Sequence, residues 1–154
     1  MDGTVATEPR NDLYEADEHA WLLRQVDLLR AGRQAEVDTE NLAEYLESMA
    51  KRDRRELLSR LAILLIHLLK YGAQPERGGI SWATTIIQQQ NEVRQILAGA
   101  PSMAQHIPAM LETAYGNARR LAAAETALPA SRFPAENPWT LDEALSFVPP
   151  DKAA

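Results

Sequence analysis

The amino-acid sequence predicts an all-α protein, a single domain built as a bundle of about five main helices. Apolar residues recur at three- and four-residue spacing through most of the chain, which is the spacing of one helix face. Several of these stretches begin with a residue pattern typical of helix caps, and no stretch alternates as a strand does. A chain of 154 residues is long enough to bury roughly 70% of its unfolded surface.

The main helices are expected at residues 12–31, 38–50, 53–72, 81–99 and 102–126. Gly32 ends the first helix, and Asp38 begins the second. Asp53 and Glu56 form the spacing of a capping box, which predicts a break near Ala50 and a new helix after it. The third helix is apolar on nearly every side in its second half, so we expect it to be the central, most buried one.

Each helix is expected to turn an apolar stripe toward the core. In the first helix that stripe consists of Leu13, Trp21, Leu22, Val26 and Leu29. Ser81 is in position to cap the fourth helix. Ser102 and Gln105 have capping-box spacing for the fifth, and Pro108 predicts a kink or a true start near residue 107.

An extended, proline-rich strap is expected after Thr126, because LPASRFPAENPW has three prolines in twelve residues. Phe133 and Trp139 would attach the strap to the bundle. Thr140 and Glu143 then predict a capped short helix over 141–147. The folded domain is expected to span 12–148, with disordered tails at 1–11 and 149–154.

Composition argues for a soluble cytoplasmic protein. The chain has no cysteine, its first residues lack the pattern of a secretory signal, and the apolar run Leu61–Leu69 is too short to span a bilayer. The formal net charge is −6, which disfavours nucleic acid as a partner. A basic segment, Lys51–Arg60, keeps weak nucleic-acid binding open as an alternative.

A series of short motifs occurs in one order along the chain: YEADEHAW (14–21), LRAGR (29–33), DTENLAEYLESM (38–49), HLLKY (67–71), QPER (74–77), SW (81–82) and AAAET (122–126). This series resembles domain-of-unknown-function family 29, a group of small, all-helical bacterial proteins with no established activity, cofactor or partner. The sequence departs from the family where Tyr45 follows Glu44, in place of a second glutamate, and where Gln90 replaces a common arginine. The resemblance directs a search for a site to Asp17, Glu44, His67, Lys70, Gln74, Ser81 and Glu125, and Asp38 is added as an expected partner of His67.

His67 is the one polar residue of the run Leu61–Leu69. It is either a structural histidine with a carboxylate or carbonyl partner, or a metal ligand or general base. If the second and third helices packed antiparallel across a break near Ala50, Asp38 would be its nearest carboxylate. The chain has no Glu-x-x-His pair, so neither a di-metal bundle nor any other cofactor is predicted.

Three functions remain open at this point. The first is a non-enzymatic interaction or scaffold protein, with a second copy or another protein as its partner. The second is an enzyme, hydrolytic or metal-assisted, that uses His67 with carboxylates of the second helix. The third is nucleic-acid binding through Lys51–Arg60, and the turn Gly78–Ser81 is a further candidate for holding an anion.

Overall fold

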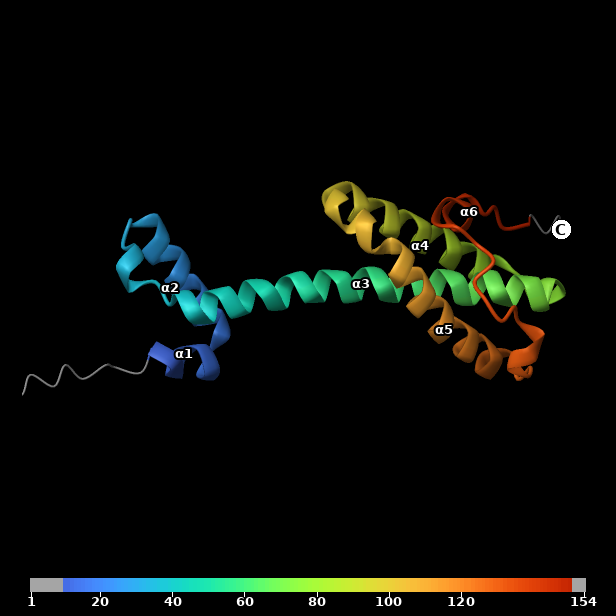
Figure 1. The fold of residues 1–154 in the computed structure, drawn as a ribbon, viewed down its shortest axis with the longest axis horizontal. Helices are drawn as coiled ribbons and strands as arrows, with labels where there is room; N and C mark the ends of the chain where they lie inside the picture. The colour runs from blue at the N-terminus through green and yellow to red at the C-terminus, as the bar shows by residue number, and fades with distance from the viewer. Residues whose placement is uncertain (1–9, 151–154) are drawn as a thin grey trace, which may run out of the picture. The chain divides into compact units, whose positions relative to one another are not determined.

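The computed structural model describes residues 10–150, and side chains from Leu13 onward (Figure 1). The all-α prediction is confirmed, and the described residues contain no strand. The chain divides into two compact units, one ending at Arg52 and one beginning at Asp53. The predicted tails fall largely on residues 1–9 and 151–154, which lie outside the described range.

The first unit starts with two helices where one was expected. Helix α1 spans Arg10–Ala16 and helix α2 spans Glu18–Arg30, with a break at Asp17. The Asp17 side chain accepts a hydrogen bond from the backbone N–H of Ala20 at 3.0 Å, so it caps α2. A short 3-10 turn, η1 (Gln34–Glu36), leads on from α2.

The buried face of α2 is only partly the predicted one. Trp21, Gln25 and Leu28 are buried, whereas Val26 and Leu29 are exposed. The stripe Leu22–Val26–Leu29 has the same spacing as Trp21–Gln25–Leu28 but is rotated by one residue, about 100° around the helix. Periodicity placed Trp21 on one inner face with Leu22, Val26 and Leu29, whereas the chain buries Trp21 with Gln25 and Leu28.

Helix α3 spans Thr39–Ala73 without interruption, so the predicted break near Ala50 is wrong. The stretch from Ala50 to Glu56 contains only residues that propagate a helix acceptably, and none of them is glycine or proline. Capping-box spacing at Asp53 and Glu56 therefore occurs inside the helix, where both side chains are exposed. The helix starts directly after Asp38, as predicted.

The second unit is built on the second half of α3, on α4 (Ile80–Gly99) and on α5 (Ile107–Thr126). Short 3-10 turns, η2 (Pro75–Arg77) and η3 (Pro101–His106), connect these helices. Helix α5 starts at Ile107, so Pro108 lies in its first turn and causes no kink. The predicted caps Ser81 and Ser102 make no capping bond.

The core of the second unit confirms that α3 is its central helix. The completely or almost completely buried side chains come from all three long helices and include Leu57, Leu61, Leu64, Leu65 and Leu68 of α3, Ile86 and Val93 of α4, and Ala114, Ala118 and Ala122 of α5. Gly78 is held close to this core, because a Cβ there would come within 2.1 Å of the Tyr71 ring.

The proline-rich strap runs from α5 to α4 and is attached at both ends. Phe133, just after the 3-10 turn η4 (Ala130–Arg132), is buried, and the Tyr115 hydroxyl donates to the Pro134 carbonyl. Helix α6 (Leu141–Ser146) begins with the predicted capping box of Thr140 and Glu143. Figure 1 shows α6 beside α4.

Gln90 also fixes the strap. Its Nε2 donates to the carbonyls of Ala144 (3.1 Å) and Phe147 (2.8 Å). A buried amide that meets two backbone carbonyls at the end of a short helix satisfies groups that would otherwise be unpaired. In this chain the position therefore has a structural role.

We predict that the protein loses stability above about pH 10. Burial raises the pKa of Tyr71. The unfolded chain therefore releases this phenolic proton at a lower pH than the folded protein does. The stability contributed by the neutral phenol is complete below the unfolded pKa and is lost as pH rises through the folded pKa.

Urea unfolding from pH 7 to 11 measures this loss. Tyr71→Phe should match the parent at pH 7, since its hydroxyl lies 3.5 Å from the Gly79 carbonyl, the outer limit of a hydrogen bond. The variant should then lose less stability than the parent above pH 10. Identical pH dependence of the two proteins would contradict the prediction.

None of the described helices combines the length and the apolar character that a membrane span requires.

Candidate functional site

Asp38 is the centre of a polar network in the first unit. Its Oδ2 accepts from Trp21 Nε1 (3.1 Å) and from Asn41 Nδ2 (2.8 Å). Its backbone N–H donates to the Oε1 of the buried Gln25 at 2.8 Å. The sequence analysis did not identify Gln25 as a buried polar residue, although a glutamine between two apolar stripes of one helix can indicate one. Because the carboxylate already accepts bonds that hold α2 against the start of α3, its role is structural.

Asp17 and Glu44 are the other searched residues of the first unit, and both are exposed. Asp17 caps α2, as described above. The pKa of Tyr14 is raised by burial and, as a smaller effect, by the negative charge of Glu44. Neither carboxylate takes part in the bonds around Asp38 given above, although Glu44 and Asp38 both act electrostatically on Tyr14.

His67 lies on α3 in the second unit and is partly buried. Its Nδ1 is 2.9 Å from the carbonyl oxygen of Ile63, one turn earlier. Because a carbonyl only accepts, Nδ1 carries the proton and donates it to this bond. The predicted pairing of His67 with Asp38 is wrong, since the antiparallel hairpin that would have joined them does not form. Among the described residues no group of three or more His, Asp or Glu side chains could hold a metal ion.

Among the residues that the resemblance singles out, Lys70 and Glu125 are joined through their side chains. Lys70 Nζ lies 3.0 Å from Glu125 Oε2 and 4.6 Å from the centre of the Trp82 ring. The Lys70 side chain is only 13% exposed and Glu125 is 47% exposed. The ammonium thus joins α3, α4 and α5 through a charge pair and a cation–π contact.

Gln74 and Ser81 flank the loop between α3 and α4. The Gln74 backbone N–H donates to the Lys70 carbonyl at 2.8 Å, and its carbonyl accepts from Arg77. Ser81 is exposed, and its carbonyl accepts from the Thr85 hydroxyl at 2.9 Å. Both residues lie at the ends of helices. In the described part of the chain, no hydrogen bond or ion pair joins either side chain to another of the candidate site residues.

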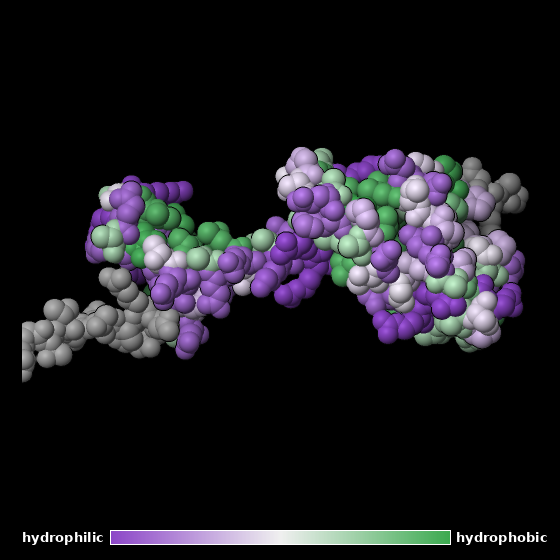
Figure 2. Space-filling view, viewed as in Figure 1, coloured by the Kyte–Doolittle hydropathy of each residue, from purple (hydrophilic) through white to green (hydrophobic). Residues whose placement is uncertain are grey.

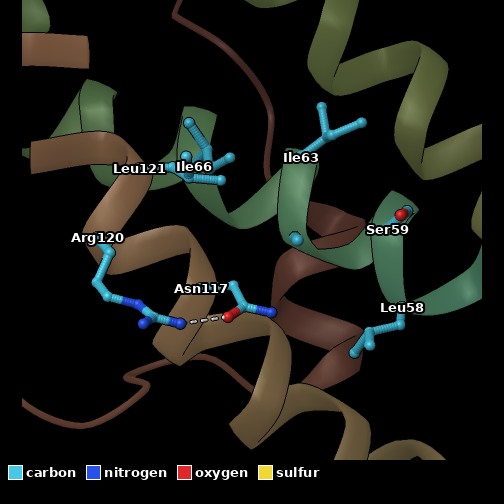
Figure 3. A pocket seen from close by; sticks show the side chains of 8 residues that line it. Leu58, Ser59, Ile63, Ile66, Asn117, Arg120 and Leu121 are labelled. Carbon is cyan, nitrogen blue, oxygen red and sulfur yellow. Dashed lines mark hydrogen bonds between the residues drawn. The ribbon is translucent and has the colours of Figure 1, made fainter. Parts of the chain in front are cut away.

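A groove of about 440 Å³ runs between α3 and α5, a part of the second unit where no functional residue was expected (Figure 3). Its lining is mainly aliphatic and consists of Leu58, Ser59, Ala62, Ile63, Ile66, Asn117, Arg120 and Leu121. Arg120 Nη2 donates to Asn117 Oδ1 at 2.7 Å. The sequence signals this groove only through the all-round apolar character of the second half of α3, a pattern that predicts burial.

An apolar surface is also exposed on the first unit. Val26 is 38% and Leu29 is 47% exposed on α2, and Leu46 of α3 is exposed as well. Figure 2 shows hydrophobic side chains gathered over α2 and the first part of α3. The exposed side chains are large and aliphatic, and they lie beside a small core that is built around Trp21.

Comparison with known proteins agrees with the resemblance seen in the sequence. No curated protein and no solved structure matches the chain. The family described as "Domain of unknown function DUF29" matches residues 13–148, which include both units and the strap. With this match over nearly the whole sequence, the chain belongs to the DUF29 family.

Proposed function

We propose that this protein is a non-enzymatic interaction protein of the bacterial cytoplasm that associates with itself. The observation that carries the proposal is the apolar stripe of α2, in which Leu22 is half-buried and Val26 and Leu29 are exposed. Soluble proteins rarely leave contiguous large aliphatic side chains in water unless the surface binds something.

The size of the first unit explains why the stripe stays uncovered within it. Helices α1 and α2 and the start of α3 can bury one face of α2, and Trp21 occupies that face. Covering a second face requires another layer of helix. Full burial of a Val or Leu side chain contributes about 1.5–3 kcal/mol, so a partner that covers the stripe is stabilised substantially.

The polar groups on which an enzyme would depend have structural bonds instead. Asp38 accepts from Trp21, His67 donates to a backbone carbonyl, and Lys70 is paired with Glu125. These bonds support an interaction protein over a hydrolytic enzyme. The net charge of −6 disfavours a nucleic-acid binder.

Light scattering and sedimentation of the full chain across a wide concentration range test the proposal. We expect an oligomer whose dissociation constant rises at least about tenfold in Val26→Glu, because a buried apolar contact becomes an unpaired charge. Arg24→Glu is the control. It places the same carboxylate at an exposed position on the opposite side of α2 from the stripe and should associate normally.

Circular dichroism of each variant checks that the helices are retained. A parent chain that stays monomeric at every concentration would overturn the proposal. Normal association of Val26→Glu would show that the stripe is not the surface through which the protein associates.

A further inference from the structure

The groove between α3 and α5 is a part of the second unit that its own chain leaves open. Tyr115 and Arg119 hold the strap through the carbonyls of Pro134 and Phe133. Asn117, Arg120 and Leu121 lie on another side of α5 and line the groove with α3. Within the described range, the strap thus covers the side of α5 that carries Tyr115 and Arg119, and nothing comparable covers the groove.

The chemistry of the groove defines what fits it. Four of its side chains on α3 are aliphatic, and Leu121 adds a fifth from α5. Arg120 supplies a positive charge at the edge, where its described bond is to the neutral amide of Asn117. No carboxylate pairs with Arg120 in the part of the chain that the structure describes. The groove therefore suits an apolar helix face that carries a carboxylate.

The apolar stripe of α2 has this character. Leu22, Val26 and Leu29 follow the i, i+4, i+7 spacing by which an amphipathic helix binds in a hydrophobic groove. Glu18 precedes Leu22 by one turn on the same stripe, is exposed, and lies in the first turn of α2. A carboxylate thus stands at one end of an aliphatic row.

The segment of the chain that carries the stripe is acidic, and the segment that carries the groove is slightly basic. This difference in charge favours contact between the stripe of one copy and the groove of another. From Leu13 to Ala50 the sequence has nine carboxylates and three arginines, whereas from Lys51 to Pro150 it has nine carboxylates and eleven basic residues. Pairing of two α2 stripes would bring like charges together. A stripe against the groove of another copy brings opposite charges together.

We infer that α2 of one copy docks in the α3–α5 groove of a second copy, with Leu22, Val26 and Leu29 against the groove and Glu18 paired with Arg120. This inference rests on the self-association proposed above and names the two surfaces that make it. Each copy offers one stripe and one groove, so the contact is heterologous, and it closes into a dimer when two copies exchange it.

Association of full-length variants tests the groove first. Leu121→Glu is expected to weaken association at least about tenfold. Ile87→Glu is the matched control, because Ile87 is 49% exposed on α4 and Leu121 is 48% exposed, yet only Leu121 lines the groove. If Val26→Glu dissociates the oligomer and Leu121→Glu does not, the stripe meets another surface. The inference then falls while self-association stands.

Charge reversal tests the pairing between copies. Glu18→Arg and Arg120→Glu should each weaken association about three- to tenfold, because an attraction becomes a repulsion. Mixing the two variants should restore association, since the introduced arginine of one chain then meets the introduced glutamate of the other, and the native Glu18 and Arg120 meet at the second contact. A mixture that stays as weak as its components overturns the pairing. A monomeric parent overturns self-association and this inference together.

Discussion

Replacing Trp21 with alanine is expected to unfold the first unit and to leave the second unit folded. Trp21 is 1% exposed, its ring contacts those of Tyr14 and Tyr45 at centroid distances of 4.6 and 6.1 Å, and its indole N–H donates to Asp38. Removing a buried tryptophan costs about 3–5 kcal/mol. The first unit has few other buried residues with which to absorb that loss.

Amide hydrogen exchange resolved by residue measures this effect. Protection should fall to that of an unfolded chain over α2, and it should persist in the leucine core of α3 around Leu61–Leu69 and in α5. Arg24→Ala, an exposed change on the same helix, should stay within about 0.5 kcal/mol of the parent. Simultaneous loss of protection in both units would contradict the prediction, as would retention in both.

Arg54→Pro is expected to disrupt α3 in its middle. In a continuous helix the proline removes the bond from residue 54 to the Ala50 carbonyl, and its ring clashes with that carbonyl, at a cost of about 3 kcal/mol or more. If a helix instead began after an Asp53 cap, residue 54 would be its first position, where proline is well tolerated. The substitution therefore distinguishes the observed helix from the hairpin that the capping-box spacing predicts.

Hydrogen exchange and the helical signal in circular dichroism again provide the measurement. Amides from Ala50 to Leu58 should exchange much faster in Arg54→Pro, with some loss of helical signal, while Arg54→Ala behaves as the parent. Unchanged exchange in the proline variant would mean that the chain already breaks at Asp53.

Local signals in the sequence marked several helix boundaries correctly, although the capping-box spacing at Asp53 and Glu56 predicted a false one. The 3.6-residue period identified every long helical segment, and Asp38, Pro108 and the Thr140–Glu143 box marked true helix starts. Three prolines in twelve residues predicted the strap. Capping residues and prolines act through hydrogen bonds and steric clashes within one helical turn. The residues that determine a helix start are therefore neighbours in the sequence.

The candidate site was less accessible to such reasoning. Of the eight searched residues, Lys70 and Glu125 meet, and Trp82 lies beneath the ammonium. The expected partner of His67 depended on a helix break that does not form. The groove at Leu121 and Arg120 was missed altogether, because its two walls come from helices that are far apart in the chain and no short motif encodes it.

The sequence by itself determined that this is an all-helical member of a family that shares its motif order, with an apolar central helix and a strap after the last long helix. Only the tertiary structure decided which stripe of α2 is buried, whether α3 is continuous, and which apolar side chains of α3 line a groove. The physical reason is that an amphipathic pattern states that a helix face must leave water, but not what will cover it. A helix face that the same chain covers and a helix face that another molecule covers show the same periodicity in the sequence.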